Sequence, residues 1–165
     1  MKTIYLIRHA EKQEWVNREA PLNKQDFIDN HRLSLKGHER ALLLASLFSN
    51  ISEIVCQTAD QTHKSQRCLD TIKHLSLKFN ISPTLFTKSD IKTMLTHIHD
   101  STHENILVCW NHDQLTDIVN SFIPSFDLHW KGKRFDVVWM LTINKEAVFS
   151  QYPMKLLYGD RDDVF

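Results

Sequence analysis

The feature that most constrains this chain is a short apolar run near its start that ends in two basic residues. Residues 3–7 suit a strand covered on both faces, and Arg8 and His9 follow them directly. Strands of this kind belong to parallel sheets, which bind ligands at the carboxyl ends of their strands. We therefore expect Arg8 and His9 at such an end, where a cation and an imidazole can hold a phosphate and attack it.

A second buried strand is predicted to end in the same way. Residues 105–110 form the most apolar strand candidate in the chain, and they run into an Asn-His-Asp sequence whose histidine is His112. If the two strands are parallel neighbours, His9 and His112 reach the same edge of the sheet. One histidine there would more often be structural, so the pair of strand ends is what indicates a site.

The remaining hydrophobic periodicity predicts alternating helices and strands. Ser34 is expected to cap the first helix, and Pro124 to stop the last one. Such alternation is typical of an α/β fold with a parallel sheet. We expect helices over about 35–48, 65–79, 90–99 and 115–122, and further strands over 53–57, 84–87, 135–143 and 147–151, the last two forming a hairpin.

Two residues in the first turns of predicted helices have more than one interpretation. Arg67 is poorly placed for the helix dipole, so either a bound anion compensates for its position or it is a surface residue that pairs with Asp70. Gly37 marks close packing, backbone approach to a ligand, or the start of the turn.

Three segments are predicted to be irregular. Residues 13–32 are polar and aperiodic, which indicates a long loop that either covers a site or forms a solvated excursion. Residues 124–134 form a connection anchored by Trp130, and the polar tail at 159–163 is expected near the surface.

Composition restricts the classes of binding partner and the cellular location that we expect for this protein. The 165 residues, 42% of them hydrophobic, suit one domain spanning residues 1–165. Lys plus Arg and Asp plus Glu both number 20, which argues against a nucleic-acid partner. No apolar run approaches the ~20 residues of a membrane span, and no signal peptide is recognisable, so we expect no membrane association and a cytoplasmic location.

Cysteine and histidine spacings do not indicate a metal centre. Cys56, Cys68 and Cys109 show no zinc-ligand or redox spacing, and free thiols favour a reducing, cytoplasmic compartment. His99 and His103 could ligate a metal if one helix carried both, but the sequence between them is expected to end the helix and leave them solvated.

Four short motifs follow one another along the chain: Leu6-Ile7-Arg8-His9-Ala10-Glu11-Lys12, Leu33-Ser34-Leu35-Lys36-Gly37, Ser65-Gln66-Arg67 and Leu107-Val108-Cys109-Trp110-Asn111-His112. In this order they resemble the motifs of the histidine phosphatase superfamily, also called the phosphoglycerate mutase-like family. Residues 135–139 are similar to that family's last core strand. The resemblance implies an α/β three-layer sandwich, with a mostly parallel central sheet flanked by helices.

The resemblance also implies a chemistry. His9 would be the nucleophile that forms a phosphohistidine, which water then hydrolyses. Arg8, Arg67 and His112 would hold the non-bridging oxygens, so positioned cations supply most of the catalysis. No metal ion and no other cofactor is then required. Glu11 either orients the nucleophile loop and contributes to substrate binding or faces solvent.

The proton donor is the point at which this chain departs from the family's main branch, because the family's mutases carry a glutamate where this chain has Thr87-Lys88-Ser89-Asp90. In the acid phosphatase and phytase branch the donor is the aspartate after the second histidine, which corresponds to Asp113. We therefore expect Asp113 as the general acid, with Asp90 as the second choice. The alternative for Asp113 is a helix N-cap. A weak donor would restrict the enzyme to good leaving groups, such as aryl phosphates or phosphoramidates.

These observations predict a metal-independent phosphatase acting on a phosphomonoester. The short chain and the missing glutamate disfavour a mutase. The alternatives are a phosphohistidine protein phosphatase and a catalytically weak domain that binds phosphate or phosphoproteins. The expected partner is a small phosphorylated molecule or a phosphoprotein, and the chain is expected to be a monomer or a dimer.

Overall fold

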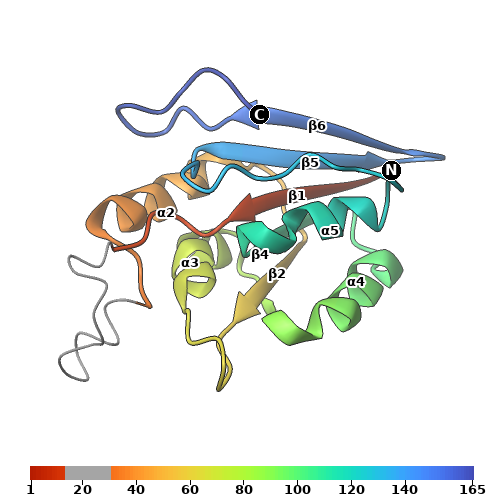
Figure 1. Ribbon diagram of the computed structural model, residues 1–165, viewed down its shortest axis with the longest axis horizontal. Helices are drawn as coiled ribbons and strands as arrows, with labels where there is room; N and C mark the ends of the chain where they lie inside the picture. The colour runs from red at the N-terminus through yellow and green to blue at the C-terminus, as the bar shows by residue number, and fades with distance from the viewer. Residues whose placement is uncertain (14–30) are drawn as a thin grey trace.

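The computed structural model describes residues 1–13 and 31–165, and the strands in these residues form one mixed sheet (Figure 1). The strand order is β3-β2-β4-β1-β5-β6. The first four of these are parallel, and β5 and β6 are antiparallel, which confirms the mostly parallel sheet. The strands are β1 (Lys2–Arg8), β2 (Glu53–Thr58), β3 (Thr84–Thr87), β4 (Asn105–Trp110), β5 (Val137–Ile143) and β6 (Ala147–Pro153).

Helices cover both faces of the sheet. Successive side chains along a strand point to opposite faces, so the apolar strands present apolar surface on both sides, and the helices bury it. In β1, Ile4 and Leu6 face one layer, whereas Tyr5 and Ile7 face the other. This arrangement confirms the predicted three-layer sandwich. The helices are α2 (Leu35–Leu47) and α3 (Arg67–Phe79) on one face, and α4 (Ile91–Asp100) and α5 (Leu115–Asn120) on the other.

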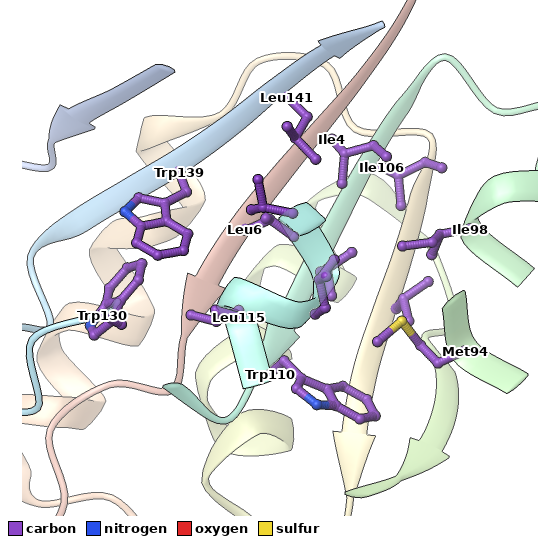
Figure 2. Close-up of a cluster of buried hydrophobic side chains, with 14 of the residues drawn as sticks. Ile4, Leu6, Met94, Ile98, Ile106, Trp110, Leu115, Trp130, Trp139 and Leu141 are labelled. Carbon is purple, nitrogen blue, oxygen red and sulfur yellow. The ribbon is translucent and has the colours of Figure 1, made fainter. Parts of the chain in front are cut away.

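The larger core lies between the sheet and α4 with α5. Met94 and Ile98 point from α4 toward the sheet, and Leu115 does so from α5 (Figure 2). Trp130 is buried beside Trp139, with ring centroids 5.0 Å apart, and its Nε1 donates a hydrogen bond to the Arg134 carbonyl at 2.8 Å. Trp130 therefore anchors the connection before β5, as predicted.

The parallel pairing of β1 and β4 is what positions the expected site. Arg8 lies opposite Trp110 in the register, so the residues that follow these two strands leave the sheet at the same edge. The prediction that His9 and His112 reach one edge of the sheet is confirmed.

The tail does not lie wholly at the surface, and that prediction is wrong for Asp160. Its side chain is only 3% exposed and forms an ion pair with the buried Arg40 at 2.7 Å. Arg40 also contacts the Glu11 carboxylate at 2.8 Å. A carboxylate can be buried when a guanidinium pairs with it, and nothing in the local polarity of the tail reveals a partner in α2.

Two further expectations from the sequence concern the loop at 13–32 and membrane-spanning helices. The predicted loop at 13–32 falls mostly on residues 14–30, which lie outside the described residues. In the described part of the chain, no helix combines the length and the apolar character needed to cross a bilayer.

Gly37 is required for close packing against the loop that follows β1. Ser34 caps α2 as predicted, and its hydroxyl accepts a hydrogen bond from the Gly37 amide at 3.1 Å. A Cβ at Gly37 would overlap the carbonyl oxygen of Glu11. Of the three interpretations left open for Gly37, the structure supports close packing.

We predict that Gly37→Ala destabilises the protein. Alanine stabilises an ordinary helix interior relative to glycine by about 1 kcal/mol, but the overlap with a backbone oxygen should reverse the sign and cost about 1–3 kcal/mol. Urea unfolding measures the difference. Glu39→Ala, at an exposed position of α2, is the matched control and should be nearly neutral. A Gly37→Ala protein more stable than the parent would contradict this account.

Candidate active site

A pocket of about 320 Å³ opens at the carboxyl ends of the parallel strands. Five of the residues expected in the site line it, namely Arg8, His9, Arg67, His112 and Asp113. A larger hollow of about 560 Å³ shares His31 and Lys64 with this pocket, but its described lining contains none of the expected site residues. The smaller pocket is therefore the candidate active site.

His9 is held as a neutral imidazole with a defined tautomer. Its Nδ1 lies 2.7 Å from the Ala10 carbonyl oxygen, which can only accept, so we assign the proton to Nδ1 and leave Nε2 unprotonated. Burial lowers the pKa of His9 to about 3, the nearby Arg8 and Arg67 act in the same direction, and the Ala10 hydrogen bond opposes them. The Ala10 amide is in turn fixed by Thr71 Oγ1 at 2.8 Å.

Arg8 presents a fixed cation beside His9. Its Nη1 donates hydrogen bonds to the carbonyl oxygens of Gly132 at 2.6 Å and Arg134 at 3.3 Å, and the guanidinium carbon lies 4.1 Å from the Phe135 ring centroid. Burial lowers the pKa of Arg8 to about 10, so the group remains charged at neutral pH. Its buried Nε has no hydrogen-bond partner among the described residues.

Arg67 faces the pocket from the first turn of α3. Burial lowers its pKa, which is the expected effect on a cation withdrawn from water. The alternative interpretation, a surface pair with Asp70, is wrong because Asp70 instead binds Arg32 at 2.6 Å. Two guanidinium groups therefore converge on the pocket from different elements.

His112 and Asp113 lie together in a short 3₁₀ turn after β4, with His112 Nε2 3.1 Å from Asp113 Oδ1. Burial lowers the pKa of His112, and Arg8 is the next largest cause. The Asp113 side chain is 65% exposed and lies at the rim. The N-cap alternative for Asp113 is wrong, because Asn111 Oδ1 accepts the capping hydrogen bond from the Gln114 amide at 3.1 Å.

Two of the expected residues lie outside this pocket. Asp90 is exposed, and its Oδ2 accepts a hydrogen bond from Thr87 Oγ1 at 3.0 Å. The Glu11 carboxylate is directed to Arg40, although its backbone oxygen accepts a hydrogen bond from the Ser34 amide at 2.9 Å. The position of Glu11 suits a residue that orients the nucleophile loop.

Several residues that line the pocket were not expected from the sequence. Gln57, at the end of β2, accepts hydrogen bonds from the Asn111 backbone amide at 3.0 Å and the Asn111 side chain at 2.8 Å, and so supports the turn that carries His112. Lys64 and Lys88 also line the pocket. Gln57 and Lys88 lie at or just after strand ends, and that position is the signal that could have identified them.

The described residues contain no group of three His, Cys, Asp or Glu side chains placed to hold a metal ion. α4 ends at Asp100, between the two histidines considered as ligands. His99 stacks on Phe122 with ring centroids 3.8 Å apart, and His103 Nε2 lies 3.7 Å from Glu53.

No protein-family model matches this sequence, and a comparison with curated proteins finds no match. Solved structures do match. The protein histidine phosphatase SixA complexed with tungstate has 10% identity and a TM-score of 0.59, covering 92% of this chain and 97% of that one. The α-ribazole phosphatase from Shigella flexneri has 13% identity and a TM-score of 0.61, with 90% and 94% covered.

A third match is a structure assigned as the phosphohistidine phosphatase SixA of Agrobacterium tumefaciens, with 15% identity and a TM-score of 0.58, covering 90% of this chain and 97% of that one. At these identities the comparisons establish the fold. They confirm the fold that the resemblance of the four motifs implied.

We predict that His9 stays neutral throughout the physiological range. Its pKa of about 3 lies below the ordinary value, so it should remain unprotonated from about pH 8 down to about pH 5, where exposed histidines gain a proton. Two-dimensional ¹⁵N–¹H spectra of the imidazoles, assigned with His9→Gln, should show the Nδ1–H tautomer with no shift over this range. Titration of the His9 signal near pH 6.5 would contradict the assignment.

Proposed function

We propose that this protein is a phosphatase that hydrolyses a phosphomonoester through a phosphohistidine formed on His9. One observation carries the proposal: a buried imidazole with an unprotonated Nε2 shares a pocket with Arg8, Arg67 and His112. A neutral imidazole is nucleophilic, and fixed cations suit the charge that a transferring phosphoryl group carries. The similarity in fold to structures named as phosphatases supports this assignment.

The proposed reaction has two steps. His9 Nε2 attacks phosphorus in line, the N–P bond forms, and the P–O bond to the leaving group breaks with its electron pair on that oxygen. Arg8, Arg67 and His112 bind the three non-bridging oxygens, where charge accumulates. Water then attacks phosphorus, the N–P bond breaks, and inorganic phosphate and free His9 are released. The two guanidinium groups supply the positive charge, so the scheme uses no metal ion.

Asp113 is the proposed proton donor to the leaving oxygen. It lines the pocket, whereas Asp90, the second choice, lies outside it. The Asp113 carboxylate is 65% exposed at the rim of the pocket, and its Oδ1 lies 3.1 Å from His112 Nε2, so it is directed in part to this neighbour and not to the leaving oxygen. We therefore propose a weak donor and a preference for leaving groups that depart without much help, such as aryl phosphates.

The weak proton donor also favours a second candidate, a phosphohistidine protein phosphatase. The N–P bond of a phosphoramidate needs less assistance from a carboxylic acid, and one matching structure is named as a protein histidine phosphatase.

We also propose that the protein is a phosphatase and not a mutase, and that its location is cytoplasmic. The free, buried thiols of Cys56, Cys68 and Cys109 are consistent with a reducing compartment.

The proposal predicts a trapped intermediate. Incubation with a ³²P-labelled aryl phosphate, followed by a rapid quench, should leave an acid-labile phosphate on the protein that disappears in His9→Ala. His38→Ala, at an exposed position of α2, is the matched control and should retain the label. Absence of both label and turnover across varied substrates would refute the phosphatase. A label that forms but decays very slowly would favour a phosphate-binding domain.

Arg67→Ala should lower kcat/KM by about a hundredfold or more, because it removes a cation from the charge of the transition state. Arg161→Ala is the control, since Arg161 is exposed and its guanidinium binds Asp163. Steady-state kinetics with an aryl phosphate measure both variants. A change of less than about threefold in Arg67→Ala would show that Arg67 does not bind the phosphoryl group.

A further inference from the structure

Two lysines at the pocket have no part in the phosphoryl transfer described above. Lys64 lies in the segment between β2 and α3, and Lys88 lies in the 3₁₀ turn after β3, yet both line the same pocket as His9. The structure shows no hydrogen bond or ion pair between Lys64 and any other described residue. The shortest polar contact of Lys88 is the 3.9 Å approach to Asp113. Their ammonium groups are available to a ligand.

The described lining of the pocket carries more positive charge than one phosphate requires. Arg8 and Arg67 face the proposed nucleophile and suit the dianion of one phosphate. Lys64 and Lys88 add two further positive charges, and Asp113 is the one carboxylate among the described lining residues. A phosphomonoester dianion bound by the two arginines would therefore leave a net positive charge on these two lysines.

The close spacing of the cations affects the pKa values of the histidines in the pocket. Arg8 and Arg67 help to lower the pKa of His9, and Lys88 contributes to the lowered pKa of His112. Repulsion of this kind is relieved by an anion, and the relief grows with the charge of the anion. A substrate with a neutral leaving group would leave the lysines uncompensated.

We infer that the substrate carries a second anionic group, a phosphate or carboxylate, on its leaving group, and that Lys64 and Lys88 bind this group at the pocket mouth. The inference rests on the proposed phosphatase function and specifies its substrate class. A pocket of about 320 Å³ is at the small end of the range for ligand sites, which fits a small metabolite.

The test compares two aryl phosphates of equal size, 4-carboxyphenyl phosphate and its neutral carboxamide analogue, 4-carbamoylphenyl phosphate. The carboxamide withdraws electrons more strongly and is the better leaving group, so a preference for the carboxylate cannot come from intrinsic reactivity. We expect kcat/KM to favour the carboxylate by about tenfold at low salt, and to favour it less as salt screens the lysines.

Variants assign the preference to the two lysines. In Lys64→Met/Lys88→Met the ratio of the two kcat/KM values should fall to about one, because the charge that distinguishes the substrates has been removed. Lys145→Met is the matched control, since Lys145 is an exposed lysine in the turn between β5 and β6, and it should retain the preference.

The outcomes separate this inference from the proposed function. Turnover that depends on His9 but shows no preference would uphold the phosphatase and overturn the second anionic group. A preference that survives in Lys64→Met/Lys88→Met would overturn the role of these lysines, and faster turnover of a phosphohistidine peptide than of either ester would overturn the small-molecule assignment. If neither ester is turned over, calorimetric binding of 4-carboxyphenylphosphonate and 4-carbamoylphenylphosphonate gives the same ratio, with the same expected and contrary results.

Discussion

The parallel pairing of β1 with β4 is the constraint on which the rest of the structure depends. Both strands are covered on both faces, so their apolar residues hold them at the centre of the sheet. Their register places Arg8 beside Trp110, and the polar residues that follow must emerge together. Because β2 lies on the other side of β4 in the same direction, the segment that leads to Arg67 starts at this edge too.

A buried ion-pair network fixes the loop that begins with His9, the proposed nucleophile. Arg40 bridges Glu11 and Asp160. Burial acts to raise the pKa of Asp160, but hydrogen bonds from Arg40 and from the Leu156 and Leu157 amides outweigh it and lower that pKa to about 2. Buried ion pairs often add little net stability, since desolvation offsets the attraction, but they require a defined arrangement of the charged groups. The network joins α2 and the tail to the residue two positions after His9, and its contribution is to hold that loop in place.

Much of the fold was predictable because its signals are local. The apolar runs of β1 and β4 and the cap at Ser34 depend on neighbours in sequence, and the structure confirms all three. The role of Asp160 was not predictable, because its partner is 120 residues away and the segment around it is polar. Within the site, Asn111 and Asp113 are both residue types that cap helices, so residue type alone did not decide that Asn111 caps the turn after β4.

The electrostatic balance of the pocket links the buried His9, the proposed nucleophile, to the cations around it. An imidazole surrounded by water would titrate near neutral pH, and an imidazolium cannot attack phosphorus. Burial alone disfavours the charged imidazole, and Arg8 and Arg67 disfavour it further. Loss of water lowers the pKa of both arginines, and the charge of Arg67 also acts to lower the pKa of Arg8. In the proposed reaction, a phosphate dianion entering this pocket meets an imidazole that is already deprotonated and cations that an anion stabilises, so one arrangement of charges suits both binding and attack.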